Sequence, residues 1–294
     1  MKNFLLVAAI ILGVFIPAGA SFSFLIKYLL MGMLFFTFLK MSIKKWRLTK
    51  SHLLIPLFTF SLSLILFLLL KDINLDLAQV VFLSIAAPTA IAAPSIISLL
   101  KGNIDYTFIS VLITNFASAV FFPVALSLLI IEDVFIPVID ILMPVLTVIL
   151  IPFAAAILLR FISGRSNGKI KLPKDLTFYL LVINIYLGVA KASDFVRNDV
   201  DTDDNIIFGI AIAIAVITVM NFSVGYFFGE KNLKIESSQS LGQKNNAFLI
   251  WIALTFINPL VAVGPVCYIV YQNFYISYQL YRKDKEKVIA SSSP

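Results

Sequence analysis

Long apolar segments separated by short polar ones run along almost the whole 294-residue chain. Many approach or exceed the roughly 18 apolar residues that a membrane-spanning helix needs. The ten-residue alternating pattern of a membrane β-barrel is absent from the sequence. The pattern therefore predicts an all-α polytopic membrane protein. The clear spans are Phe4–Pro17, Phe22–Met41, Leu53–Leu70, Leu75–Leu100, Tyr106–Ile131, Phe135–Phe161, Leu176–Ala192, Ile206–Phe228 and Leu260–Tyr281.

Charged residues in the loops predict the orientation of these spans. Basic and acidic loops alternate along the chain, and cytoplasmic loops are the ones that carry excess Lys and Arg. We therefore expect a prokaryotic-type plasma (inner) membrane protein with both termini in the cytoplasm. The same topology explains the formal charge of +7 without a nucleic-acid partner. The cytoplasmic set is Lys44, Lys45, Arg47, Lys50, Arg160, Arg165, Lys169, Lys171, Lys174, Arg282, Lys283, Lys285 and Lys287; the outer set is Glu132, Asp133, Asp199, Asp201, Asp203 and Asp204.

The N-terminus allows two interpretations. Lys2, the apolar run to Ile16 and the small residues Ala18-Gly19-Ala20 resemble a secretory signal with its cleavage site. The number of spans required below favours the other interpretation, that this segment is the first membrane helix.

The predicted orientation requires one more crossing between Lys231 and Pro259. The only continuous apolar run there is Ala247–Ile257, whose eleven residues rise about 16 Å as a helix. That covers about half of a hydrocarbon core roughly 30 Å thick. The polar stretch Leu233–Asn246 must supply the rest, and such a stretch is tolerated at membrane depth only where protein or water covers it. We therefore predict a broken ninth helix, giving ten spans.

The fourth span carries its own interruption. Pro88 and Pro94 each remove a backbone donor and disfavour helical geometry at Ala87 and Ala93. Ordinary proline kinks are the alternative. Because the matching helix of the other half is also broken, the pattern favours an inverted repeat of helices 1–5 and 6–10. Interrupted helices at corresponding positions are typical of transporter binding sites.

Along the chain, residues 1–161 would hold the first repeat with helix 6. Residues 162–174 would form a cytoplasmic linker, and residues 175–294 would hold helices 7–10 with a basic tail. The segment Asp199–Asn205 resembles the start of a calcium-binding loop, but Asp204 stands where that loop needs glycine. We interpret it as a solvated acidic loop.

Three motifs resemble the bile acid:sodium symporter family. The segment Pro88–Asn103, ending Ser-Leu-Leu-Lys-Gly-Asn, is similar to the family's fourth-helix signature. The segment Met31–Phe36 resembles its second helix, and Leu241–Asn245 (Leu-Gly-Gln-Lys-Asn) resembles its ninth-helix motif. The resemblance implies ten helices, a panel domain of helices 1, 2, 6 and 7, and a core domain of helices 3–5 and 8–10. It also implies crossing broken helices 4 and 9 and sodium-coupled uptake of organic anions.

The sodium-binding positions that this resemblance implies are altered in the chain. The family's Ser-Asn pair falls on Ala93 and Pro94, and its next two hydroxyl ligands fall on Thr107 and Val111. Proline at the first crossing resembles auxin efflux carriers, which share this fold and are thought not to use sodium.

The ninth-helix motif also differs from the family at its sodium-binding positions. The family's sodium-binding glutamate falls on Ser240, and its second-site glutamine falls on Lys244. We therefore predict no metal site and no cofactor. A conventional sodium symporter with relocated ligands, for instance near Thr107 and Ser240, is the alternative.

Lys244 is the central candidate, because an ionisable group at membrane depth is a functional hypothesis by default. Its ammonium could replace sodium, neutralise helix-end carbonyls and help to hold an anion. Because burial disfavours a charged ammonium, loss of its proton would make transport proton-coupled. A fixed structural cation is a second interpretation, and a side chain that reaches the cytoplasmic surface is a third.

The predicted function is alternating-access transport of a small or amphipathic carboxylate. A channel or a receptor competes with this prediction, whereas an enzyme is disfavoured because no hydrolase, metalloprotease or nucleotide-binding motif occurs. Asn115 and Asn184 are secondary candidates, better explained as helix–helix hydrogen bonds. The primary site candidates are Lys244, Asn245, Asn246, Gln243, Ser240, Gly242, Pro88, Thr89, Pro94, Ser95 and Thr107.

Overall fold

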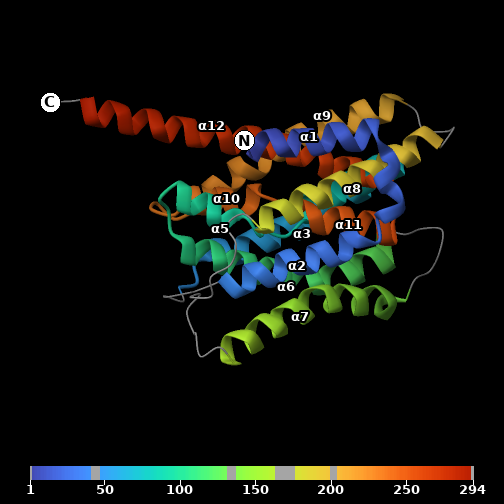
Figure 1. Cartoon of the computed structure of the whole chain (residues 1–294), viewed down its shortest axis with the longest axis horizontal. Helices are drawn as coiled ribbons and strands as arrows, with labels where there is room; N and C mark the ends of the chain where they lie inside the picture. Colours follow the sequence, from blue (N-terminus) through green and yellow to red (C-terminus); the bar gives the residue numbers. More distant parts are fainter. Residues whose placement is uncertain (1, 41–46, 131–136, 163–175, 199–203, 293–294) are drawn as a thin grey trace.

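The computed structural model describes residues 2–40, 47–130, 137–162, 176–198 and 204–292, and these form helices joined by short connections (Figure 1). No β-strand occurs within these ranges apart from one isolated bridge. The α-helices are α1 (Lys2–Phe15), α2 (Leu25–Lys40), α3 (Lys50–Leu70), α4 (Leu75–Ala86), α5 (Ala93–Leu99), α6 (Ile104–Ala125), α7 (Val138–Ile162), α8 (Leu176–Asn198), α9 (Asp204–Phe228), α10 (Lys234–Gly242), α11 (Asn246–Phe256) and α12 (Val263–Ser292). Shorter turns are η1 (Pro17–Phe22), the π-helical η2 (Leu126–Ile130) and η3 (Leu260–Ala262).

Among the described residues, six helices are long and apolar enough to cross a membrane, which supports an integral membrane protein. They are α3, α6, α7, α8, α9 and α12, the last together with η3. Four shorter apolar helices, α1, α2, α4 and α11, accompany them. The coarse expectation of an all-helical membrane protein is thus confirmed.

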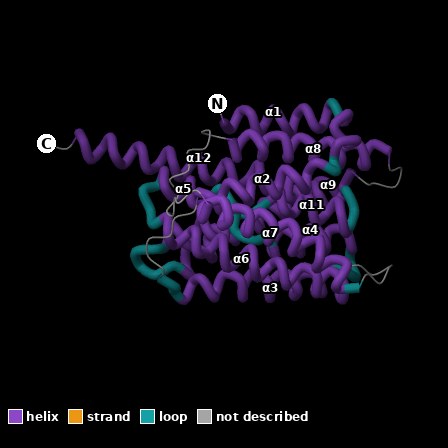
Figure 2. The backbone as a smooth tube through the Cα atoms, turned by 60° about the horizontal axis from the view of Figure 1, so that its bottom comes forward, coloured by secondary structure: helices purple, strands orange, loops and turns teal. Residues whose placement is uncertain are grey.

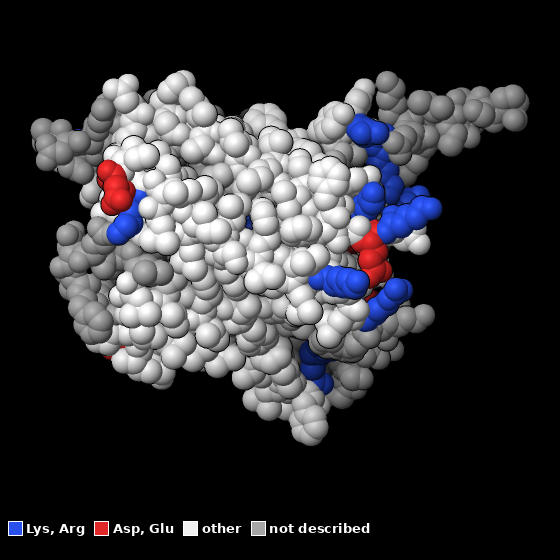
Figure 3. Space-filling view, turned by 180° about the vertical axis from the view of Figure 1, so that it is seen from behind, with Lys and Arg blue, Asp and Glu red and all other residues white. Residues whose placement is uncertain are grey.

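The charges of the described residues gather at the two ends of the bundle. On the face that Figure 3 shows, Lys and Arg cluster at the end from which α12 projects, and the surface between the ends is almost free of charge. The starts of α3 and α10 and the end of α5 meet at one end of the bundle, which carries Arg47, Lys50, Lys101, Lys231 and Lys234 and which we call the basic end. An exposed ion pair between Arg47 and Glu230, 3.5 Å apart, lies there.

The helices pack in two neighbouring sets (Figure 2). In one set, α8 packs against both α1 and α2, and α2 also packs against α7. In the other, α9 contacts α4, α10 and α12, while α3 packs against α4 and α5 against α6. The two sets meet where α11 contacts α2 and α8 and where α6 contacts α7.

The breaks in the fourth and ninth predicted spans are shorter than expected. The prediction that Pro94 takes Ala93 out of helical geometry is wrong, because Ala93 begins α5 and Pro94 occupies the first turn, where its missing N–H costs nothing. The polar stretch Leu233–Asn246, predicted to contain the break of the ninth helix, is also mostly regular, because α10 runs from Lys234 to Gly242. The interruptions are therefore Ala87–Ala92 and Gln243–Asn245, which together we call the crossover.

Two predicted ends also differ from the structure. The seventh span was expected to end at Ala192, but α8 continues to Asn198, and Arg197 donates a hydrogen bond to the Val14 carbonyl. The tenth was expected to end at Tyr281, but α12 continues to Ser292 and projects beyond the bundle.

Some predictions fall largely outside the described residues. These are the linker at 162–174, the basic residues Lys44 and Lys45, the acidic pair Glu132 and Asp133, and most of the calcium-like loop.

Candidate functional site at the crossing of two interrupted helices

Local sequence explains where the first interrupted helix stops. α4 ends at Ala86 because the next residue, Ala87, precedes Pro88 and takes an extended conformation with φ −52° and ψ 136°. The second interruption has no proline. There Gln243 is extended, with φ −85° and ψ 114°, and the Asn245 side chain accepts a hydrogen bond from the Phe248 N–H at the start of α11.

The two interruptions pair with each other through their backbones. The Ala90 N–H donates to the Gln243 carbonyl at 2.8 Å, and the Asn245 N–H donates to the Pro88 carbonyl at 2.9 Å. These bonds form an isolated antiparallel bridge between Thr89 and Lys244. Backbone groups that each helix frees at its break are thus satisfied by the other helix, as the interior of a membrane protein requires.

The side chains of the two bridge residues make equivalent contacts. The Thr89 hydroxyl donates to the Ser240 carbonyl at 2.6 Å, and the Lys244 Nζ donates to the Ile85 carbonyl at 2.9 Å. Ser240 lies four residues before Lys244, and Ile85 lies four residues before Thr89. Each bridge residue therefore caps the carbonyl end of the opposite half-helix.

The helices that follow the interruptions repeat this equivalence. The Thr89 N–H donates to Thr114 Oγ1 on α6 at 3.0 Å, and the Lys244 N–H donates to Gln272 Oε1 on α12 at 3.2 Å. The next residue in each helix is an asparagine whose Nδ2 donates to the carbonyl four residues earlier, at 2.8 Å for Asn115 and 2.7 Å for Asn273. The two crossings are thus locally pseudo-symmetric.

The chemical difference is that Lys244 carries an ionisable amine, whereas Thr89 carries a hydroxyl. Its side chain is only 2% exposed, and its Nζ also donates to the Ala87 carbonyl at 3.2 Å. The carbonyl end of a helix carries partial negative charge, so a cation is favoured there. Within the described ranges, no carboxylate forms an ion pair with this ammonium. The interpretation that Lys244 extends to the cytoplasmic surface is therefore wrong.

Several other predicted residues gather around the bridge. Asn115 Nδ2 donates to the Thr89 carbonyl at 3.3 Å, and Asn245 Nδ2 donates to Asn115 Oδ1 at 3.4 Å. Gln243 lies on the α10 side of the bridge, where its Nε2 donates to Gln239 Oε1. A β-carbon on Gly242 would lie 2.2 Å from the Phe222 ring, so only glycine allows this close approach of α10 to α9.

Three predicted residues lie away from the bridge. Ser95 is exposed on α5, and its N–H donates to the Ala92 carbonyl at 3.0 Å. Thr107 is buried, but its hydroxyl donates to the Asn103 carbonyl at 3.4 Å, about two turns before Thr114 on α6. Asn184 lies on α8 and donates to the Ile26 carbonyl of α2 at 3.0 Å.

The prediction missed residues that act on the crossover backbone from neighbouring helices. Besides Thr114 and Gln272, Tyr268 donates its hydroxyl to the Gly242 carbonyl at 2.8 Å. One sequence signal could have found two of them. Thr114-Asn115 and Gln272-Asn273 are adjacent polar pairs inside otherwise apolar spans.

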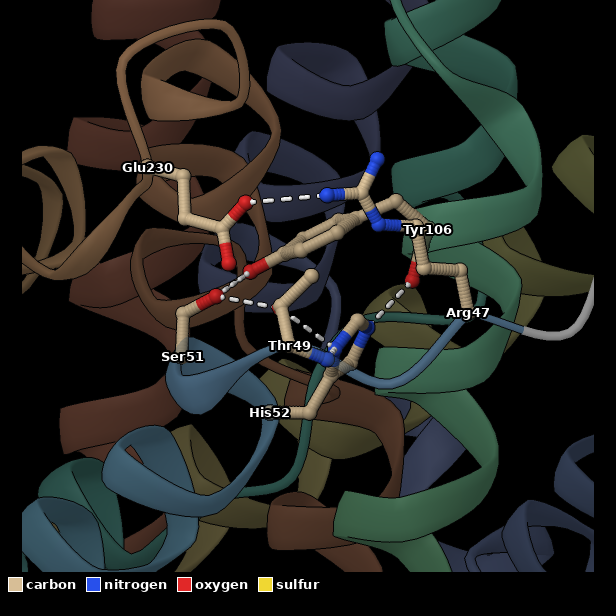
Figure 4. A network of polar contacts seen from close by, with 6 residues as sticks. All are labelled: Arg47, Thr49, Ser51, His52, Tyr106 and Glu230. Carbon is tan, nitrogen blue, oxygen red and sulfur yellow. Dashed lines mark hydrogen bonds and ion pairs between the residues drawn. The ribbon is translucent and has the colours of Figure 1, made fainter.

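A separate polar network joins the starts of α3 and α6 at the basic end (Figure 4). The Thr49 N–H donates to His52 Nδ1 at 3.1 Å, so this nitrogen carries no proton. His52 Nε2, 3.0 Å from the Tyr106 carbonyl oxygen, is therefore the donor. The Ser51 and Tyr106 hydroxyl oxygens are 2.7 Å apart. A neutral histidine thus fastens two helix starts, and none of these bonds reaches the crossover.

No group of three or more His, Cys, Asp or Glu side chains that could hold a metal ion occurs among the described residues. At the carbonyl end of α4, a donor already fills the place that a cation could take, namely the Lys244 ammonium. No protein-family model matches the chain, and no curated protein matches it either.

Proposed function

We propose that this protein is a secondary transporter of an organic anion in which Lys244 supplies the positive charge that a coupling ion supplies elsewhere. The single observation that carries the proposal is the contact of the buried Lys244 ammonium with the Ile85 and Ala87 carbonyls. In broken-helix transporters, half-helix carbonyl ends and unwound backbone coordinate the coupling cation. Here a covalently attached cation takes that role, so transport is independent of sodium.

The proposed architecture has ten crossings in two inverted repeats. These ten membrane-spanning segments are the six long apolar helices, the shorter helices α1 and α2, and the two interrupted pairs α4–α5 and α10–α11. The equivalent contacts of Thr89 and Lys244 support the repeat, because they match residue by residue. The excess of Lys and Arg at the basic end supports a cytoplasmic position for that end and for both termini.

Alternating access would move two groups of helices against each other. The panel would consist of α1, α2, α7 and α8, which pack mainly among themselves, and the core would carry the crossover. The contact of α11 with α2 and α8 lies on the boundary between these groups. A substrate bound at this boundary would be exposed to one side of the membrane at a time.

Charge favours an anionic substrate. An ammonium has three donors, and the bonds to Ile85 and Ala87 use two of them in the described structure. The third could bind a carboxylate, and the bound anion would then neutralise the only buried charge at the crossover. If the ammonium instead gives up its proton in one half of the cycle, protons would drive uptake.

The test is counterflow and uptake of labelled carboxylates in proteoliposomes, with sodium and pH gradients imposed separately. We expect uptake that needs no sodium and that falls at least about tenfold in Lys244→Ala, the effect of losing one charge-assisted hydrogen bond. The matched control is Lys191→Ala, which removes a partly buried lysine near the C-terminal end of α8. Undiminished uptake by Lys244→Ala would refute the role of Lys244.

A conventional sodium symporter with relocated ligands is the second candidate. Ser240 Oγ favours it, because this buried oxygen at the end of α10 has no partner among the described residues. The second candidate predicts that sodium raises the melting temperature of the purified protein and that Ser240→Ala removes this rise. Lys244-based transport predicts no sodium effect beyond that of potassium.

A further inference from the structure

Two asparagine side chains, one on α8 and one at the start of α11, hold buried carbonyl oxygens that lack a hydrogen-bond donor among the described residues. Asn184 is fully buried on α8, and Asn246 at the start of α11 is 3% exposed. The Oδ1 atom of each has no partner within the described ranges. Because buried amide oxygens in folded proteins are nearly always paired, two such atoms at one boundary require an explanation.

The orientation of both amides is fixed by their nitrogen atoms. Asn184 Nδ2 donates to the Ile26 carbonyl at 3.0 Å, and Asn246 Nδ2 donates to the Lys244 carbonyl at 3.1 Å. Exchanging nitrogen and oxygen in either amide would bring two carbonyl oxygens together. Each side chain therefore offers an acceptor, and not a donor, to whatever lies on its other side.

Helix packing brings the two side chains to one level. α8 and α11 pack closely at Gly188, where a β-carbon would lie 2.6 Å from Ile250 Cγ2. Asn184 and Asn246 each precede this contact by four residues, about one helical turn. Both helices run toward the same end of the molecule (Figure 1), so both asparagines lie on the crossover side of the contact, and Asn184 also bonds to α2.

The other unpaired oxygens differ from these two in chemistry or in position. Those of Ser84, Ser118 and Ser240 are hydroxyls, which can rotate toward a different partner. Asn221 Oδ1 is also unpaired, and the orientation of its amide is fixed because Nδ2 donates to the Tyr268 hydroxyl at 3.1 Å. That contact joins α9 to α12, away from α2 and α8, and it makes Asn221 a natural control.

We propose that Asn184 and Asn246 bind a hydrogen-bond donor of the transported anion, so that the substrate is a hydroxylated or amino-bearing carboxylate. This inference rests on the proposed function, with the carboxylate bound by Lys244. An acid without such a donor leaves both oxygens unpaired in a buried site. A site built to hydrogen-bond a hydroxyl rejects the analogue that lacks it.

Thermal-shift titration with matched acids tests the proposal. Suitable pairs are mandelate with phenylacetate and 3-hydroxybutyrate with butyrate, each applied to the full-length protein in detergent. We expect the hydroxylated acid of at least one pair to bind about tenfold more tightly, as one hydrogen bond made in a buried site allows. Asn184→Leu and Asn246→Leu should reduce this ratio of the two affinities to below about twofold.

The control Asn221→Leu should keep the tenfold ratio. Asn184→Ala is a second variant if the leucine variant does not fold, because it removes the amide oxygen without adding bulk. Equal affinities within every pair, or a ratio that survives in both variants, would overturn the inference and assign the oxygens to bound water. If no acid of any pair shifts the melting temperature, the organic-anion function itself fails.

Discussion

The two crossings of the interrupted helices share one geometry but differ in the group that caps the opposite helix, a threonine hydroxyl at one and the Lys244 amine at the other. At the first, a threonine hydroxyl caps the end of α10 through the Ser240 carbonyl at 2.6 Å. At the second, the Lys244 ammonium caps the end of α4 through the Ile85 carbonyl at 2.9 Å. The backbone bonds of the two bridge residues to α6 and α12 also correspond.

The hydroxyl cap and the amine cap differ in what the backbone requires of them. A neutral hydroxyl is sufficient to satisfy a broken helix end, as Thr89 does. The ammonium of Lys244 is therefore more than the backbone needs, and burying it without a carboxylate carries a cost in stability. Groups that lower stability are expected where function requires them, which makes Lys244 the residue to test.

The largest expected effect comes from making both crossings charged. Thr89→Lys would bury a second ammonium beside Lys244 with no carboxylate to compensate it, and an uncompensated buried charge costs about 3–5 kcal/mol. Unfolding of the purified protein in detergent measures this loss. Thr89→Val is the control, with an expected loss of about 1 kcal/mol for the missing hydroxyl bond. Equal stability of the two variants would mean that water reaches the crossover.

Making both crossings neutral should affect transport more than stability. Lys244→Met leaves the Ile85 and Ala87 carbonyls without their donor, at about 1–3 kcal/mol each, but it also removes the desolvation cost of the ammonium, which is of similar size. We expect uptake to fall at least about tenfold, or ~1.4 kcal/mol in the transition state. The unfolding free energy should change by less than in Thr89→Lys. Strong destabilisation with residual uptake unchanged would indicate a purely structural cation.

Replacing the fixed cation by an acidic residue tests whether the same place accepts an ion. In Ser240→Glu combined with Lys244→Gln, the local formal charge changes from +1 to −1. Sodium should then stabilise the protein by about 1.4 kcal/mol at ten times its dissociation constant. The melting temperature in sodium against potassium measures this, with wild-type protein as the control. A variant that folds but responds equally to both ions would show that the resemblance to sodium symporters does not extend to this place.

Much of the helical order could be predicted from the sequence because apolar length alone reports membrane spans. The break after α4 was also readable, because proline constrains the residue before it. The continuation of α10 through the polar run to Gly242 was not readable, because neighbouring helices make it possible. Ser238, for example, donates its hydroxyl to the Phe222 carbonyl of α9 at 2.7 Å.

The candidate site was predictable where a residue is chemically unusual for its surroundings. Lys244 stands out because a charge inside a membrane span is costly. Thr114 and Gln272 are marked in the sequence only by the polar pairs that they form with Asn115 and Asn273, which do not reveal a role. Each contributes one acceptor to a backbone N–H that only the folded crossover brings near. Their role depends on tertiary contacts between segments far apart in the chain.

The smallest expected effect is the difference in stability between two variants, each of which weakens the support of one crossing. Thr114→Val removes the acceptor of the Thr89 N–H, and Gln272→Leu removes that of the Lys244 N–H. Each leaves one buried donor unpaired, so each should cost about 1–3 kcal/mol in detergent unfolding. Because the two bonds correspond, we expect the two losses to agree within about 0.5 kcal/mol and to add in the double variant. A loss confined to Gln272→Leu would mean that the charged crossing alone depends on its supporting helix.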